Sequence, residues 1–159
     1  MTPATHHVAQ LNIGLLRHPL DDARTSGFAD NTDKVNAIAE RSAGFVWRLL
    51  DEAAALQDEG IALYNGDPRA ICTLSVWESP ADLENFVLRT VHGAFLKRRA
   101  DWFEPQDHKT YVIWPVPAGH VPSIAEGLDR LARLEAGGSN EGAYDFNHLR
   151  HSLLEGDET

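Results

Sequence analysis

Hydrophobic and polar residues alternate in four segments of the chain, and this period of two predicts β-strands. The segments span residues 7–14, 45–50, 70–77 and 110–116. In the first segment Ala9, Leu11 and Ile13 share one face, while Gln10 and Asn12 share the other. A strand of this kind is expected to bury at least its apolar face.

The second and third strands show the same division into two faces. In the third, the apolar face carries Leu74 and the mixed face carries Thr73 and Trp77. In the second, strict alternation places Phe45, Trp47 and Leu49 on one face and Val46, Arg48 and Leu50 on the other. The sequence leaves open which of these last two faces points inward.

Three segments show the three- and four-residue spacing of amphipathic helices: 21–41, 79–103 and 123–136. Ser79-Pro80 provides an N-cap oxygen and a first-turn proline, and Ser123 with Glu126 forms a capping-box pattern. Gly93 predicts a kink or a second short helix. The acidic segment 51–69 is expected to be a surface connection, and 143–149 alternates again and could add a short fifth strand.

The order strand, helix, strand, strand, helix, strand is that of the split βαβ arrangement. It predicts an α+β, ferredoxin-like domain: an antiparallel sheet of four or five strands with helices 21–41 and 79–103 on one face. If the apolar faces with Leu11 and Leu74 pack beneath those helices, the face with Asn12 and Thr73 needs a roof of loops or a second subunit.

Composition narrows the partners and the compartment. The 159 residues suit one domain, with a short polar lead and a flexible acidic tail after about residue 150. A net charge of −10 argues against duplex nucleic acid and anionic membranes as partners. One cysteine, Cys72, forms no internal disulfide, and the N-terminus has no signal-peptide pattern, so a cytoplasmic location is expected.

His92 is the first candidate for acid–base chemistry. Seven-residue spacing places His92 and Arg99 close to one helical stripe, with Phe95 between them. A neutral histidine can act as a base while an arginine stabilises an anionic oxygen, and Asn12 and Thr73 can orient the substrate. A plain alternative stays open, in which His92 is solvated and Arg99 pairs with a neighbouring acid.

Aromatic side chains supply candidate walls for a flat apolar ligand, although large aromatics are also ordinary core residues. The predicted substrate-binding residues are Trp47, Arg48, Thr73, Trp77, Phe95, Trp102 and Trp114. No paired cysteines, HExxH motif or glycine-rich phosphate loop is present in the sequence, so neither a metal nor a nucleotide cofactor is expected.

Several motifs occur together in a recognisable order: Gly44-Phe45-Val46-Trp47-Arg48, His92 to Arg99 running into Trp102-Phe103, and Trp114 to His120. With the opening strand 9–13 they resemble the bacterial family called domain of unknown function 3291, over roughly residues 7–149. That family is similar to the dimeric α+β barrel superfamily, which includes antibiotic-biosynthesis monooxygenases and haem-degrading enzymes. The resemblance implies this fold and a homodimer, and it leaves the reaction open.

The leading functional hypothesis is a small-molecule enzyme that needs no cofactor. It would carry out monooxygenation or acid–base chemistry, as an isomerase, cyclase or lyase, on an aromatic or polyketide-like substrate of secondary metabolism. Two alternatives remain: a non-catalytic ligand-binding or stress-response barrel, and a haem-binding oxidoreductase with His92 as the iron ligand.

Overall fold

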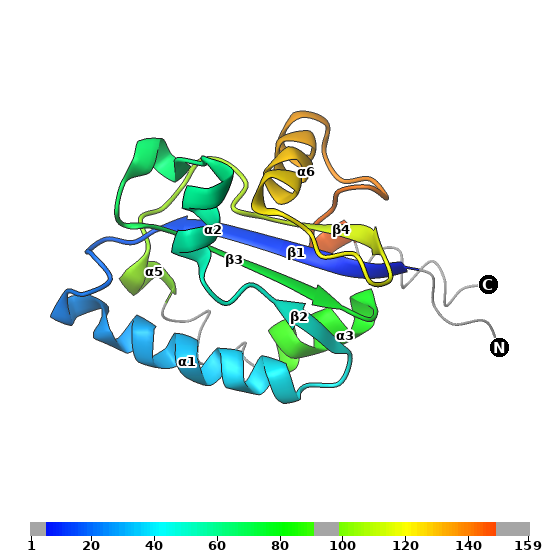
Figure 1. Ribbon diagram of the computed structural model, residues 1–159, viewed down its shortest axis with the longest axis horizontal. Helices are drawn as coiled ribbons and strands as arrows, with labels where there is room; N and C mark the ends of the chain where they lie inside the picture. Colours follow the sequence, from blue (N-terminus) through cyan, green and yellow to red (C-terminus); the bar gives the residue numbers. More distant parts are fainter. Residues whose placement is uncertain (1–5, 91–98, 149–159) are drawn as a thin grey trace.

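The computed structural model describes residues 6–90 and 99–148 and has an antiparallel sheet between two layers of helices (Figure 1). The strands are β1 (His6–Leu15), β2 (Phe45–Arg48), β3 (Ala70–Trp77) and β4 (Tyr111–Pro117). The α-helices are α1 (Ser26–Arg41), α2 (Glu52–Glu59), α3 (Pro80–Glu84), α5 (Arg99–Trp102) and α6 (Ile124–Gly137). Shorter helical turns span η1 (Ala23–Thr25), η2 (Leu63–Gly66) and η3 (Asn85–Thr90), the last of them a π-helix.

The sheet has the strand order β2-β3-β1-β4, and each neighbouring pair is antiparallel. The long strand β1 lies in the middle, with Leu11 opposite Leu74 of β3 and opposite Val112 of β4. Helices α1 and α3 lie on the same side of this sheet (Figure 1). The predicted α+β, ferredoxin-like fold is therefore confirmed.

The predicted helix starts form as the cap residues indicate. The Ser79 hydroxyl accepts a hydrogen bond from the Asp82 N–H at 3.1 Å, and the Ser123 hydroxyl accepts one from the Glu126 N–H at 3.1 Å. The segment predicted as one helix over 79–103 is seen as α3, the π-helix η3 and the short α5. The kink predicted at Gly93 lies outside the described residues.

The two faces of the sheet are covered in the opposite way to that expected. The apolar face of β1 and β3 packs against α6 and α2, in a core that includes Leu11, Leu74, Ile124, Leu131 and Leu134. The mixed face lies beneath α1 and α3 instead. Helices of the same chain therefore cover both faces, so the expected need for a roof from a second subunit does not arise.

Two segments that the sequence defined only loosely take a definite form in the structure. Segment 51–69 contains α2, whose N-cap Asp51 accepts a hydrogen bond from the Ala54 N–H at 3.0 Å and whose C-cap Gly60 has a positive φ of 69°. Such a cap pair is typical of a true helix. Segment 143–149 forms no fifth strand within its described part, because isolated bridges, including Ile113 to Tyr144, are followed by a helical turn at residues 146–148.

Helix α6 is held to the sheet by a partly buried polar contact and a close approach. The Trp114 indole donates to the Glu126 carboxylate at 2.8 Å, and His120 lies 2.7 Å from the other carboxylate oxygen. Partial burial acts to raise the pKa of Glu126, but the hydrogen bonds from His120 and Trp114 outweigh it and lower that pKa. At Gly127 the helix comes so close that a Cβ would lie 2.9 Å from Leu11.

We expect Gly127→Ala to destabilise the fold although alanine favours helices. The new Cβ would lie 2.9 Å from the Leu11 side chain and 3.1 Å from Trp114, both fully buried, so the helix must move away. Overpacking of this kind costs about 1–3 kcal/mol, against a gain in helix propensity of about 1 kcal/mol. Urea unfolding should show a net loss of up to about 2 kcal/mol.

Gly137→Ala is the matched control, because the same helix gains the same methyl group with no described atom within 4 Å. It should leave the free energy of unfolding unchanged or raise it by less than about 1 kcal/mol. Equal effects of the two substitutions would show that α6 does not pack against Leu11 and Trp114 as described.

Candidate functional site

A cavity of about 410 Å³ lies between α1 and the mixed face of the sheet. Pockets that hold small molecules commonly enclose about 300–1,000 Å³. Its lining comes from α1, β1, β2 and β3, with contributions from η3 and from Phe103 after α5. The walls are therefore built mainly on regular elements and on residues packed against them.

Apolar side chains form most of the walls. Phe28, Val35 and Ala39 line the cavity from α1. At one end Trp77 stacks on Phe86 with ring centroids 4.9 Å apart, and Phe45 meets Trp77 edge-on at 5.5 Å. At the other end Phe28 meets Phe103 edge-on at 5.2 Å. The cavity thus has an aromatic cluster at each end and suits a ligand with a flat apolar body.

The floor of the cavity is polar. Asn12 of β1 lies opposite Thr73 of β3, and its amide nitrogen donates to the Thr73 hydroxyl at 3.0 Å. Two pairs further along, on the same face, Gln10 lies opposite Ser75, whose hydroxyl accepts a hydrogen bond from the Trp77 indole at 3.1 Å. These side chains offer donors and acceptors to a ligand at fixed positions on two paired strands.

A β-bulge in β2 brings Arg48 to the same cavity. Phe45 pairs with Trp77, but Trp47 pairs with Val76 and Arg48 with Ser75, so the register shifts between Phe45 and Trp47. The strict alternation expected for residues 45–50 is therefore wrong. One extra residue turns Trp47 to the opposite face and lets Phe45 and Arg48 both line the cavity.

Arg48 and Glu52 give the cavity opposite charges. The Arg48 guanidinium is largely buried, with 21% of its side chain exposed, and its Nε donates to Glu40 at 2.9 Å. Glu52, at the start of α2, is half-buried and also lines the cavity. Its burial raises the pKa, an effect larger than the opposing hydrogen bond from its own N–H and the attraction of Arg48.

The structure brings together four of the predicted site residues and separates others. Asn12, Arg48, Thr73 and Trp77 all line the cavity. By contrast, Trp47 and Trp114 pack in the core on the opposite face of the sheet. Trp102 is buried against Phe28, with ring centroids 5.6 Å apart, at the edge of the cavity but outside its lining.

Three predicted residues fall wholly or partly outside the described part of the chain. His92 and Phe95 lie there entirely. Arg99 begins α5, but its side chain is not described. The expected convergence of His92 and Arg99 with Asn12 and Thr73 is therefore not tested and stays a prediction.

Glu52 and Phe28 line the cavity, although the sequence did not single them out as candidates. Glu52 directly follows Asp51, and the helix start at that aspartate was the available signal for its placement. Phe28 appeared in the sequence only as part of the apolar stripe of α1. Nothing in such a stripe distinguishes a residue that lines a cavity from one that fills a core.

The described residues offer little to a metal or haem. They contain no group of three or more histidine, cysteine, aspartate or glutamate residues able to hold a metal ion. No described residue that lines the cavity is a histidine. Burial raises the pKa of Cys72 to about 12, with further effects from Glu52 and Glu59, so this thiol stays protonated. Within residues 6–90 and 99–148 no helix is long and apolar enough to cross a membrane.

The comparisons with known proteins give a family. The family model described as "Domain of unknown function (DUF3291)" matches residues 7–155. The chain belongs to this family. No curated protein matches this chain. Among solved structures it is similar to a protein of unknown function, NE2512 from Nitrosomonas europaea, with 11% identity and a TM-score of 0.46, over 75% of this chain and 97% of that one.

The raised pKa of Glu52 can be measured directly. In a carboxyl ¹³C NMR titration, assigned with Glu52→Gln, the midpoint of Glu52 should lie above the ordinary value of 4.5. Arg48→Met should move it higher still, because the nearby cation favours the charged carboxylate. A midpoint at or below 4.5 would contradict the described burial of this group.

The same shift has a consequence for stability. A carboxyl group whose pKa is raised by folding binds more protons in the folded state than in the unfolded state. The free energy of unfolding should therefore fall as pH rises from about 4.5 through the folded-state pKa, and Glu52→Gln should remove that part of the fall.

Proposed function

We propose that the cavity beneath α1 binds a small, largely apolar molecule that carries a carboxylate or carbonyl oxygen, and that the protein acts on it by acid–base chemistry. The observation that carries this proposal is the division of one cavity into aromatic walls and a polar floor, with Arg48 and Glu52 both in its lining. Walls of this kind favour an aromatic or polyketide-like body, and the polar groups favour one orientation of it.

Arg48 is the natural partner for the oxygen of the ligand. Its Nε donates to Glu40, and an Nη1 hydrogen is directed to the Leu49 carbonyl at 3.4 Å, so its bonds to described residues leave other N–H groups of the guanidinium for a ligand. Its low exposure strengthens a charge-assisted bond to an anionic ligand. Asn12 and Thr73 lie on the paired strands β1 and β3 and would hydrogen-bond other polar atoms of the ligand.

Glu52 is the described residue best suited to move a proton. A carboxyl group with a raised pKa is a stronger base than an ordinary one, and a neighbouring arginine stabilises the enolate that proton removal from a carbonyl compound creates. Isomerisation and cyclisation can start from such an enolate, and so can oxygenation without a cofactor. A non-catalytic binding protein would use the same cavity without turnover, and Glu52→Gln separates the two: it would abolish turnover and retain binding only in the enzyme.

The homodimer is also part of the proposal. Because helices cover both sheet faces, the second copy would meet the chain elsewhere, and the edge strand β2 is the best candidate surface. Val46 on that strand is 40% exposed and Leu50 just after it is 76% exposed. Light scattering at micromolar concentration should give twice the chain mass, and a monomer mass would end this part of the proposal.

The binding proposal predicts that filling the cavity abolishes binding. The probe is 2-naphthoate, which joins a flat apolar body to a carboxylate, and its affinity is measured by isothermal titration calorimetry. Thr32→Trp places an indole into the cavity from α1 and should weaken binding at least about tenfold, since the indole takes the volume of the ligand. Ala37→Trp adds the same indole to an exposed position of the same helix, outside the cavity lining, and should change the affinity less than about twofold.

The polar part of the site has its own control in the same experiment. Arg48→Met keeps most of the length of the side chain and removes its charge. It should therefore weaken the binding of 2-naphthoate by about tenfold, a loss of about 1.4 kcal/mol in binding free energy. The affinity for the neutral ketone 2-acetylnaphthalene should fall much less in the same variant. If Thr32→Trp and Ala37→Trp have equal effects, or wild type binds neither compound, this cavity is not the binding site.

A further inference from the structure

A second cavity, of about 440 Å³, lies beyond the end of the one beneath α1. Its lining is more polar and includes Arg17, Gln106 and His108. Of the described residues that line the two cavities, only Gly14 and Phe103 belong to both. The two spaces therefore meet at this one pair.

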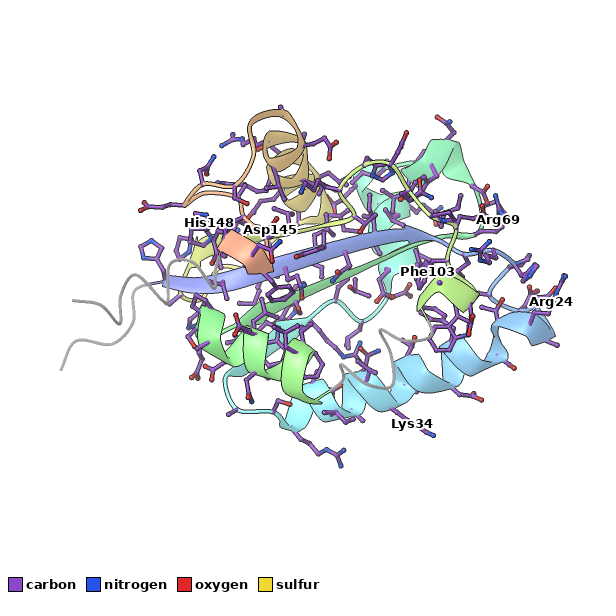
Figure 2. The ribbon with its side chains drawn as sticks, turned by 180° about the vertical axis from the view of Figure 1, so that it is seen from behind. Arg24, Lys34, Arg69, Phe103, Asp145 and His148 are labelled. Carbon is purple, nitrogen blue, oxygen red and sulfur yellow. The ribbon has the colours of Figure 1, made fainter. Side chains whose placement is uncertain are left out.

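Phe103 covers Gly14 with its aromatic ring. A Cβ on Gly14 would lie 2.6 Å from Cε1 and 2.8 Å from Cδ1 of Phe103, so only glycine permits this approach. Gly14 has no positive φ, so it is needed here for space rather than for backbone conformation. Figure 2 shows Phe103 beside α5, in the layer between the sheet and α1.

The backbone that carries Phe103 is fixed on both sides. Phe103 forms an antiparallel bridge with Leu16. The Arg17 N–H donates to the Trp102 carbonyl at 2.8 Å, and the Glu104 N–H donates to the Leu15 carbonyl at 2.8 Å. The ring itself is 8% exposed and packs edge-on against Phe28. It is thus held in place by its backbone and by its neighbours.

The sheet register gives the distance from Arg48 to this wall. Arg48 lies opposite Ser75, and Gly14 lies opposite Ile71, four residues further along β3. Four strand residues span about 13 Å. Arg48 and the wall at Gly14 and Phe103 are therefore separated by about 13 Å along the strand direction, and a ligand with its carboxylate at Arg48 extends toward that wall.

We infer that Phe103 is the wall that divides one long binding channel into two compartments, and that it sets the greatest length of ligand the cavity beneath α1 accepts. This inference rests on the proposed function, since it concerns the ligand of that same cavity. Removing the ring would join the two spaces, because among the described residues no other is shared between their linings apart from Gly14.

The test is a series of n-alkanoates from hexanoate to hexadecanoate, each measured by its displacement of 2-naphthoate. Each added methylene that the protein buries should tighten binding by about fourfold. In wild type the gain should stop at the chain length that meets Phe103. In Phe103→Ala the gain should continue for at least about two further methylenes, into the space between Gly14 and Gln106.

Two further variants keep the outcome clear. Phe103→Leu fills part of the opened space, so it should shift the limit of alkanoate chain length less than Phe103→Ala does. If Phe103→Ala does not fold, Phe103→Leu still tests whether Phe103 sets this limit. Leu16→Ala loosens the same hydrophobic cluster but lines neither cavity, so it should leave the limit unchanged. If all variants bind 2-naphthoate and show the same limit of alkanoate chain length, the inference about Phe103 is wrong while the proposed function stands. Absence of 2-naphthoate binding in wild type would overturn the proposed function and this inference with it.

Discussion

The structure depends on the way α1 rests on a sheet face that carries polar side chains at its centre. Gln10, Asn12, Thr73 and Ser75 occupy the middle of that face, where they cannot close a dry core. Apolar side chains on this face form two clusters, one that contains Trp77 and Phe86 and one that contains Phe28 and Phe103. The two clusters support α1 at both ends, and the cavity is the space left between them.

The opposite face of the same sheet carries apolar residues and forms a core without a polar centre. There Leu11 and Leu74 meet Leu131 and Leu134 of α6 in a continuous core, and Gly127 brings the helix into direct contact. The Trp114 indole is buried there too, with its N–H bonded to Glu126. The continuous apolar core and the cavity therefore lie on different faces of the sheet, so the cavity of about 410 Å³ under α1 does not interrupt that core.

The strands and the fold class could be predicted because they depend on local periodicity, which short segments such as Ala70–Trp77 express fully. Which face of the sheet packs against which helices could not be predicted, because either face of β1 can receive a helix. Only the packing of the whole chain decides between the two arrangements. The bulge between Phe45 and Trp47 was also missed, since a single extra residue leaves no mark on an alternating pattern. It is this bulge that brings Arg48 into the site.

Of the candidate site, polar residues on predicted strands were the ones that sequence could find. Asn12 and Thr73 were identified because strand periodicity places them on one face, and register then pairs them. Glu52 was missed because its segment was expected to be a surface connection, and a surface position gives no reason to expect partial burial or a raised pKa. The four tryptophans could not be sorted by sequence, since residue type alone does not tell a wall from a core.

Those tryptophans now provide the most direct test of the central claim, that a small apolar ligand binds beneath α1. Each indole N–H gives its own NMR signal, and Trp77 lines the cavity while Trp114 is buried on the opposite face. Titration with 2-naphthoate should shift the Trp77 indole signal in a saturable way and leave that of Trp114 unchanged. A saturable shift at Trp114 with none at Trp77 would contradict the claim.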